Sequence, residues 1–386
     1  MAVINWYNEN NWQIRFLNNG KQVRQQKMKI YRREDGFIDF AERAADALLI
    51  VCDVNTAPLA ADIEKILKKC GKKYDIFCFP DSHLIPEIER LKDVTVAAAG
   101  TEYILGVGSG VINDICKYLS VRSGRPYGIL ATAPSMDGYV SGVSALYENG
   151  RKVTFPTTVP SDILIDMEIL ANAPFDMIVA GAGDLIGKNT SLLDWKLAHL
   201  LRSEKYDPAI VGRMKKALML GMSSAELLCA RDKGAVKDLI DGLILSGIEM
   251  QNAGNSRPAS GSEHHISHYL EMAGEREGRD FAPHGVKVAL GCLLSVSMYK
   301  VAAERYEELN VLSDDIRALP SLKELEMLYE KIGLPVRFGR IGVSARLLSE
   351  TIEKAWTVRD RYTIMTFLHE KGALGEFAAR LSEAFA

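Results

Sequence analysis

Histidines gather in one short part of this chain. Four of the seven, His264, His265, His268 and His284, fall within 21 residues. His264 and His268 are four residues apart and share one face of a helix, and His284 opens the next helix, close enough in sequence to fold back. Imidazoles that converge on one point, together with a carboxylate, form a site for a first-row divalent metal. The alternative is a solvated polar helix face, but the clustering favours a metal site.

A candidate carboxylate stands in a glycine-rich run about 80 residues earlier, Gly181-Ala182-Gly183-Asp184-Leu185-Ile186-Gly187-Lys188. We interpret this run as the start of a helix in which small residues let a ligand approach Asp184. Lys188 lies one helical turn further along the same face. It either forms a salt bridge with Asp184 or anchors an anionic ligand, and the pattern does not decide between the two.

A second glycine-rich run, Gly106-Val107-Gly108-Ser109-Gly110, follows an apolar strand and opens a helix over residues 111–123. Glycines allow a ligand close to the backbone, and the first turn of a helix offers unpaired N–H groups and a positive dipole. This pattern is typical of a pyrophosphate site. The alternative is a tight strand-to-helix turn, since the full GxGxxG spacing is absent.

Two further polar segments follow predicted strands. Asp53 comes directly after an apolar run and can accept hydrogen bonds from ribose hydroxyls, or it can cap the turn that follows. The loop from Thr132 to Ser141 carries hydroxyls that can bind a phosphate or a carboxamide, and its carboxylate, Asp137, can bind a substrate hydroxyl. The alternative for this loop is a polar surface turn.

The elements around these residues divide the chain into two halves. Apolar runs at 48–52, 74–79, 103–107 and 127–131 alternate with helical patterns at 60–69, 84–92 and 111–123, which predicts a parallel sheet covered on both faces. Residues 13–29, with a turn at Asn18-Asn19-Gly20, predict a hairpin. From Pro174 onward amphipathic helices dominate. We therefore expect an α/β nucleotide-binding domain over 1–170 and an all-α domain that binds metal and substrate over 171–386.

Composition excludes several classes of protein. The chain has 386 residues, with 47 Lys and Arg against 50 Asp and Glu, so its net charge is −3. Without a basic excess it is a poor nucleic-acid binder. No run reaches 18 consecutive apolar residues, so no transmembrane helix is expected. The N-terminus lacks the features of a signal peptide, and the six scattered cysteines indicate free thiols. These features together predict a cytoplasmic protein.

In combination, these motifs resemble the dehydroquinate synthase/iron-containing alcohol dehydrogenase superfamily, and within it the glycerol-1-phosphate dehydrogenases. The resemblance extends from about Asp53 to Leu368. The stretches that carry it are Gly108-Ser109-Gly110 with Asp114 and Lys117, residues 132–138, Gly181–Asp184 with Lys188, Thr190 and Asp194-Trp195, residues 256–264 with His268, His284-Gly285, and Arg361-Tyr362-Thr363-Ile364. One departure is Ser109, where family members often have glycine, although a serine can cap the helix that follows.

The resemblance implies a Rossmann-like N-terminal domain, a helical C-terminal domain and a site between them. It implies that Asp184, His264 and His284 bind one divalent metal ion, zinc or nickel, with iron as a further option. It places His268 and Asp137 near the substrate. It implies contacts to NAD(H), or alternatively NADP(H), from Asp53, Gly108, Gly110, Val111, Ile112, Asn113, Asp114, Thr132, Ala133, Pro134, Ser135 and Ser141.

The reaction implied by the resemblance is reduction of dihydroxyacetone phosphate to sn-glycerol 1-phosphate by a homodimer. In it, His268 is a candidate proton relay, and Lys188 and Arg257 are candidate phosphate anchors, on charge and position alone. Two rival functions use the same residues: a dehydrogenase of an unphosphorylated polyol, and a dehydroquinate-synthase-type lyase in which the nucleotide is oxidised and reduced again within one turnover. A binding module without catalysis is a more distant alternative.

Overall fold

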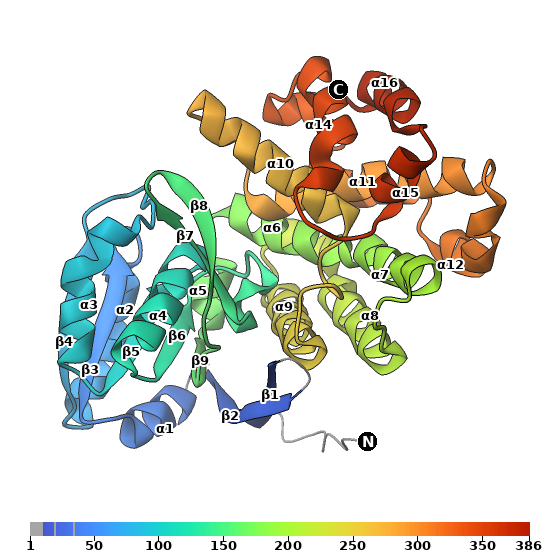
Figure 1. Ribbon diagram of the computed structural model, residues 1–386. Coiled ribbons are helices and arrows are strands. Elements are labelled where there is room, and N and C mark those ends of the chain that lie inside the picture. Colours follow the sequence, from blue (N-terminus) through green and yellow to red (C-terminus); the bar gives the residue numbers. More distant parts are fainter. Residues whose placement is uncertain (1–10, 19–20, 34) are drawn as a thin grey trace. The chain divides into compact units, whose positions relative to one another are not determined.

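The computed structural model describes residues 11–18, 21–33 and 35–386, and the chain divides into two compact units (Figure 1). One unit extends to Ala173 but omits Ser135–Asp137. The other contains Ser135–Asp137 and Pro174–Ala386. From the sequence we placed the boundary at residue 170 and assigned Asp137 to the first domain, whereas by its contacts Asp137 belongs to the second unit.

The first unit is built on a seven-stranded sheet with the order β1-β2-β9-β6-β5-β3-β4. Its strands are β1 (Asn11–Asn18), β2 (Lys21–Arg32), β3 (Ala47–Asp53), β4 (Lys73–Phe79), β5 (Tyr103–Gly108), β6 (Tyr127–Ala131) and β9 (Asp162–Ile165). All neighbours are parallel except β1 and β2, which form the predicted hairpin. The turn residues Asn19 and Gly20 lie outside the described residues. The predicted parallel sheet is thus confirmed.

Helices pack against this sheet and bury its apolar residues. They are α1 (Asp35–Arg43), α2 (Ala57–Lys69), α3 (Lys92–Ala99), α4 (Gly110–Ser123) and the short α5 (Met167–Ala171). Ile63 and Leu67 of α2 belong to the same buried cluster as Leu48 and Ile50 of β3. The apolar spacing of α2, with Ile63 and Leu67 four residues apart, therefore places one helix face on the sheet.

Sequence patterns missed or misplaced three elements of this unit. The predicted helix at 84–92 is wrong: only a short 3-10 turn (Ile88–Leu91) and then α3 are helical, because Pro86 disfavours helical backbone at the residue before it. The central strand β9 was missed because it has only four residues. The hairpin of β7 (Val143–Glu148) and β8 (Arg151–Pro156) was also missed, although its turn, Asn149-Gly150 with positive φ at both residues, is a recognisable signal.

The second unit is helical, as the sequence predicted, and no strand occurs among its described residues. Its helices are α6 (Phe175–Ile186), α7 (Lys188–Arg202), α8 (Pro208–Met222), α9 (Lys233–Ala253), α10 (Ser262–Glu277), α11 (His284–Ala303), α12 (Ser313–Ala318), α13 (Leu322–Ile332), α14 (Ala345–Lys354), α15 (Ile364–Glu370) and α16 (Leu374–Phe385). We expected the run at 181–188 to start a helix, but it forms the end of α6, and Gly187 joins α6 to α7.

Close helix packing explains three glycines of this unit. A Cβ on Gly183 would overlap the carbonyl of Gly285, and a Cβ on Gly285 would overlap the carbonyl of Ala180, so α6 and α11 touch backbone to backbone. A Cβ on Gly291 would lie 2.6 Å from the carbonyl oxygen of Glu263, which brings α10 equally close to α11. We had interpreted Gly183 as space for a ligand, but here the missing Cβ makes room for a neighbouring helix.

Helix α11 is the apolar centre of this unit. Among the described residues it is the one helix long and apolar enough to cross a membrane, with a mean hydropathy of 1.5 over the best window. However, 83% of that window is buried inside the protein. Core helices of globular units have the same length and composition, so this helix is weak evidence for a membrane span.

The contact between α6 and α11 makes a testable prediction. Gly285→Ala should lower the free energy of unfolding by about 3 kcal/mol, because the added methyl group meets backbone rather than a flexible side chain. Gly212→Ala is the matched control, since nothing lies within 4 Å of a Cβ there, and it should stabilise α8 by about 0.5–1 kcal/mol. Urea unfolding followed by circular dichroism measures both. A Gly285→Ala variant as stable as the wild type would show that the two helices separate without cost.

Candidate active site

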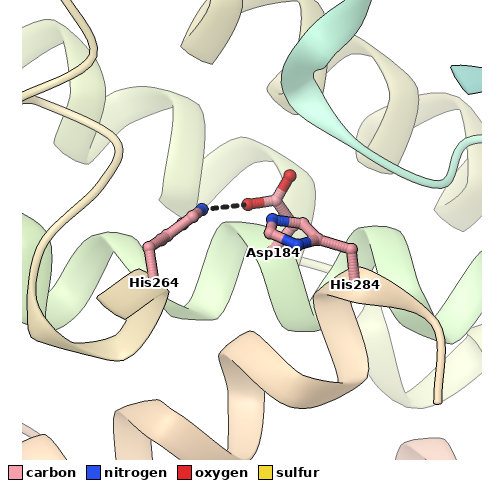
Figure 2. A group of neighbouring side chains, drawn as sticks. All are labelled: Asp184, His264 and His284. Atoms are coloured by element: carbon pink, nitrogen blue, oxygen red, sulfur yellow. Dashed lines mark ion pairs between the residues drawn. The ribbon is translucent and has the colours of Figure 1, made fainter. Parts of the chain in front are cut away.

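Three side chains from different helices of the second unit converge (Figure 2). Asp184 comes from the last turn of α6, His264 from the first turn of α10, and His284 is the first residue of α11. Their candidate ligand atoms all lie within 4.8 Å of one another, and Nε2 of His264 is 3.6 Å from Oδ1 of Asp184. Asp184 and His264 are buried, whereas the His284 side chain is 35% exposed. The structure thus brings together the three residues that we predicted as metal ligands.

A carboxylate stands behind each of the two imidazoles. Nδ1 of His264 is 2.8 Å from Glu263, and Nδ1 of His284 is 2.7 Å from Glu271. An ionised carboxylate only accepts hydrogen bonds, so each Nδ1 donates, and in the neutral imidazole Nε2 is then the atom that can bind a metal. The sequence patterns did not predict a role for either glutamate. The spacing of Glu271, seven residues after His264 on the same helix face, was a usable signal.

His268 uses both of its ring nitrogens. Nδ1 lies 3.1 Å from Oε2 of Glu271, and Nε2 accepts a hydrogen bond of 3.1 Å from Arg359. Burial lowers the pKa of His268 to about 3, even though the charge of Glu271 opposes this shift. His268, Glu271 and His284 form a second group with ligand atoms within 4.8 Å, but Glu271 already bridges the two imidazoles. In this arrangement His268 is neutral and accepts a hydrogen bond, so a proton-relay role stays a prediction.

Lys188 is completely buried between two carboxylates. Its Nζ is 2.7 Å from Oδ1 of Asp184 and 2.8 Å from Oδ2 of Asp137. Burial alone lowers the pKa of the ammonium, but the two negative charges outweigh burial and raise it. Burial likewise favours a neutral Asp184, yet Lys188 and the neighbouring imidazoles hold the pKa of this carboxyl well below its usual value. Of the two interpretations left open for Lys188, the structure shows the salt bridge.

Asp137 is tied to the same centre. Its backbone N–H donates to Oδ2 of Asp184 at 3.0 Å, and Oδ2 of Asp137 accepts a hydrogen bond of 2.8 Å from Ser246 of α9. These contacts explain why Ser135–Asp137 group with the helical unit. Ser246 carried no sequence signal, because one serine on a buried helix face looks like any other.

Asp194 organises the loop that leads into α10. Its carboxylate accepts hydrogen bonds from the Ser262 backbone and hydroxyl at 2.6 and 2.7 Å, from Tyr299 at 2.6 Å, and from the backbone of Ile364 at 2.8 Å. A Cβ on Gly261 would lie 2.5 Å from its Oδ2. Burial, together with the charge of Glu263, raises the pKa of Asp194 to about 6. One buried carboxylate of α7 thus joins α10, α11 and α15.

Arg257, our second candidate phosphate anchor, is largely engaged in structural contacts. It is 3% exposed, its Nε pairs with Glu204 at 2.8 Å, and one terminal nitrogen donates to the carbonyls of Asp194 and Tyr362 at 3.3 and 2.9 Å. These contacts hold the loop before α10 against the segment before α15. They give Arg257 a scaffolding role.

In the first unit, the predicted nucleotide-binding motifs lie at one edge of the sheet. Asp53 ends β3, Gly108 ends β5, and Thr132 follows β6; β5 lies between β3 and β6 in the sheet. The carboxyl ends of neighbouring parallel strands meet at one edge, where open α/β sheets bind ligands. The structure therefore brings these three segments together.

Several predicted nucleotide contacts have structural partners of their own. A Cβ on Gly108 would lie 2.5 Å from Cβ of Ile112, so this glycine serves the tight turn into α4. Asn113 is fully buried and donates to the carbonyl of Gly138 at 3.3 Å. Ser109 precedes α4, but its side chain forms no capping hydrogen bond, contrary to our expectation. Val111, 39% exposed, faces outward at the start of the helix.

Lys117 of α4 holds the next loop in place. Its buried Nζ lies 2.7 Å from both the Gly138 carbonyl and the Ser141 hydroxyl, and 3.1 Å from Asp114. The Ala133 carbonyl accepts a hydrogen bond of 2.8 Å from Tyr139. Asp114 and Ser141 are therefore part of this scaffold. Thr132 and Pro134 are also buried, and Ser135 is half-buried.

Asp53 caps a turn. Its Oδ1 accepts hydrogen bonds from the backbone N–H groups of Asn55 and Thr56 at 2.9 and 3.0 Å. Its Oδ2 has no partner among the residues that the structure describes. The capping role is thus present in the structure, and a ribose contact through Oδ2 stays a prediction.

Comparison with known proteins places the chain in a family. The model of the iron-containing alcohol dehydrogenase family matches residues 30–174. The glycerol-1-phosphate dehydrogenase [NAD(P)+] of Halalkalibacterium halodurans is 34% identical over 83% of this chain and 86% of its own length. The enzyme of the same name from Bacillus velezensis is 34% identical over 84% and 86%. The chain belongs to the glycerol-1-phosphate dehydrogenase family. The family resemblance inferred from the motifs is thereby confirmed.

A solved structure supports the fold of this glycerol-1-phosphate dehydrogenase family member. The iron-containing alcohol dehydrogenase of Thermococcus thioreducens superposes with a TM-score of 0.69 at 17% sequence identity, covering 92% of this chain and 98% of that protein. At this identity the likeness concerns the fold alone. It agrees with a parallel sheet followed by a helical region.

The converging side chains of α6, α10 and α11 make a second prediction. Asp184→Ala and His264→Ala should each lose bound divalent metal, because two remaining ligands hold a first-row ion weakly. Metal content after exhaustive dialysis, measured by mass spectrometry, checks this. His83→Ala, which removes an exposed imidazole of the first unit, should retain the metal. Unchanged metal content in the Asp184 and His264 variants would contradict the site.

Proposed function

We propose that this protein reduces dihydroxyacetone phosphate to sn-glycerol 1-phosphate with NAD(P)H, in a reaction that depends on a divalent metal. The observation that carries the proposal is the group of Asp184, His264 and His284, with a glutamate behind each imidazole. The names of the relatives support the substrate and the nucleotide. A homodimer in the cytoplasm stays a prediction from the sequence.

The donor set fits a divalent cation. One carboxylate and two imidazoles suit zinc, nickel or iron, and the exposed side of His284 leaves room for a substrate oxygen. When bound there, the cation supplies Lewis acidity to the ketone oxygen of the substrate. Glu263 and Glu271 orient the imidazoles and make their Nε2 atoms stronger ligands for a metal ion.

Lys188 and Asp137 have separate roles in the proposed site: Lys188 positions the carboxylates, and Asp137 can contact the substrate. Lys188 holds both carboxylates in place, since its ammonium contacts each of them, and it keeps Asp184 ionised. Oδ1 of Asp137 has no hydrogen-bond partner among the described residues and can accept one from the C3 hydroxyl of the substrate. Asp137 therefore has two roles: its Oδ2 contacts Lys188 and Ser246, and its Oδ1 faces the substrate in this proposal.

In this proposal the first unit binds the nucleotide. The N–H groups at the start of α4 face the pyrophosphate, and the loop from Thr132 to Ser135 lies beside them at the end of β6. Asp53 accepts hydrogen bonds from the ribose. The remaining predicted contacts, Asn113, Asp114 and Ser141, support these segments through the hydrogen bonds described above.

The experiment that tests the function compares four substrates with the purified protein: dihydroxyacetone phosphate, dihydroxyacetone, glycerol 1-phosphate and glycerol. We expect net NADH oxidation and a kcat/KM at least about 100-fold higher for the phosphorylated ketone, since charged contacts to the phosphate contribute about 3 kcal/mol. Equal rates on both ketones would favour a polyol dehydrogenase. A nucleotide that is never consumed would favour a lyase.

The free Oδ2 of Asp53 makes a further prediction. The wild type should prefer NADH, because the carboxylate repels the 2′-phosphate of NADPH. Asp53→Asn keeps an acceptor oxygen for the turn but removes the charge. It should raise kcat/KM with NADPH relative to NADH by about tenfold. An unchanged ratio would show that Asp53 acts only as a cap.

A further inference from the structure

Two half-buried arginines of the second unit form no hydrogen bond or ion pair with a carboxylate among the described residues. Arg359 and Arg361 lie in the segment between α14 and α15, and both are half-buried. Neither forms an ion pair with any residue that the structure describes. Arg359 donates to Nε2 of His268, and Arg361 donates to the Ser260 carbonyl at 3.1 Å and to the Ser256 hydroxyl at 2.7 Å. Other half-buried arginines of this unit form ion pairs: Arg213 pairs with Glu249, and Arg337 pairs with Glu326.

Buried polar atoms without partners occur beside them. Both ring nitrogens of His265, the hydroxyl of Ser260 and one terminal nitrogen of Arg257 are buried and have no hydrogen-bond partner among the described residues. His265 and Ser260 are 0% and 3% exposed. A buried polar group without a partner costs about 1–3 kcal/mol. These four atoms belong to residues 257–265, a segment that Arg361 contacts at Ser256 and Ser260, and they indicate that a ligand completes their hydrogen bonds.

These residues share one electrostatic environment. Arg361 donates to the carbonyl of Ser260, and Arg257 donates to the carbonyl of Tyr362, the residue next to Arg361. Burial and then the charges of Arg359 and Arg257 lower the pKa of Arg361 to about 10. We call Arg257, Arg359, Arg361, His265 and Ser260 the arginine cluster. Three guanidinium groups close together repel one another. The charge of Glu271 near Arg359 and that of Glu204 near Arg361 offset part of this repulsion, and a bound anion offsets more of it.

We propose that the arginine cluster binds the phosphate group of the substrate, chiefly through Arg359 and Arg361. This inference rests on the proposed function for the identity of the phosphate ester. In this proposal the arginine cluster takes the role of phosphate anchor that the sequence suggested for Lys188, because two carboxylates hold the Lys188 ammonium. Arg257, the other sequence candidate, has a supporting role. His265 and Ser260 supply neutral hydrogen bonds to the phosphate oxygens, through atoms that have no other partner.

The location suits a small phosphorylated ketone. Arg359 touches His268, whose ring centroid is 5.4 Å from that of His284 and 6.1 Å from that of His264. In dihydroxyacetone phosphate, one methylene and one ester oxygen separate the phosphate from the C2 carbonyl. A phosphate at the arginine cluster therefore leaves the carbonyl on the side of His264 and His284. His268, neutral and bonded to Arg359, is then a positioning residue for the guanidinium.

Inorganic phosphate tests the cluster without turnover. Phosphate should raise the melting temperature of the wild type more than chloride at equal ionic strength, since it binds the folded protein. This extra stabilisation should disappear in Arg361→Met and shrink in Arg359→Met, while Arg340→Met, at an exposed position, should keep it. Phosphate bound at the nucleotide site contributes equally to all variants, so the difference between them reports the cluster.

Replacing His265 separates ligand binding from folding. Because its nitrogens have no hydrogen-bond partner among the described residues, His265→Phe should melt in chloride at a temperature no lower than the wild type, yet gain less from phosphate. A large loss of stability in chloride would assign His265 to the core. Equal phosphate stabilisation in the wild type, the His265→Phe variant and both Met variants would overturn the proposal.

Kinetics provide the second test. The ratio of kcat/KM for dihydroxyacetone phosphate over dihydroxyacetone should fall about 10- to 100-fold in each Met variant. Arg361→Lys, which keeps the charge, should recover part of the ratio. Unchanged ratios in both Met variants of an enzyme that prefers the phosphorylated ketone would overturn this inference and leave the function intact. A wild type without that preference would overturn the function, while the melting experiment would still decide whether the cluster binds phosphate.

Discussion

The buried ammonium of Lys188 is the interaction on which the rest of the site depends. It sits between the carboxylates of Asp184 and Asp137 and is shielded from water. Removing one partner of a buried ion pair leaves an uncompensated charge, which costs about 3–5 kcal/mol. Lys188 therefore fixes Asp184 at the end of α6 and holds Ser135–Asp137 in the helical unit. It also keeps Asp184 ionised, and an ionised carboxylate is what a divalent cation requires.

The same centre requires helices that approach more closely than side chains usually allow. Gly183 and Gly285 let α6 touch α11, and Gly291 lets α11 touch α10. Two of these glycines stand next to a proposed metal ligand: Asp184 follows Gly183, and His284 precedes Gly285. Backbone contact thus converts three residues from separate helices into one group of ligand atoms. Glu263 and Glu271 then set the orientation of the two imidazoles.

The loop from Ser256 to His264 serves two purposes. Its end carries His264, which lies next to Asp184, whereas Ser256 and Ser260 accept hydrogen bonds from Arg361 before α15. Asp194 joins these parts, because it binds the backbone of both Ser262 and Ile364. In the proposed function, the reacting carbonyl and the phosphate of one small substrate are recognised by the two ends of this loop. The spacing between the two sites is then set by a rigid, buried hydrogen-bond network.

Local sequence patterns determined the fold class, the apolar strands at 48–52, 103–107 and 127–131, and the residues with metal-binding chemistry, because periodicity and residue type are properties of neighbouring positions. They did not determine β9, a strand of four residues that only its partners β2 and β6 make recognisable. They also left Lys188 undecided between salt bridge and anion anchor, and misjudged Gly183 as space for a ligand. Only the tertiary structure decided these points, since Asp137 and Gly285 reach their partners through contacts between segments far apart in the chain. Charge, burial and close packing depend on those partners, and no local pattern specifies which they are.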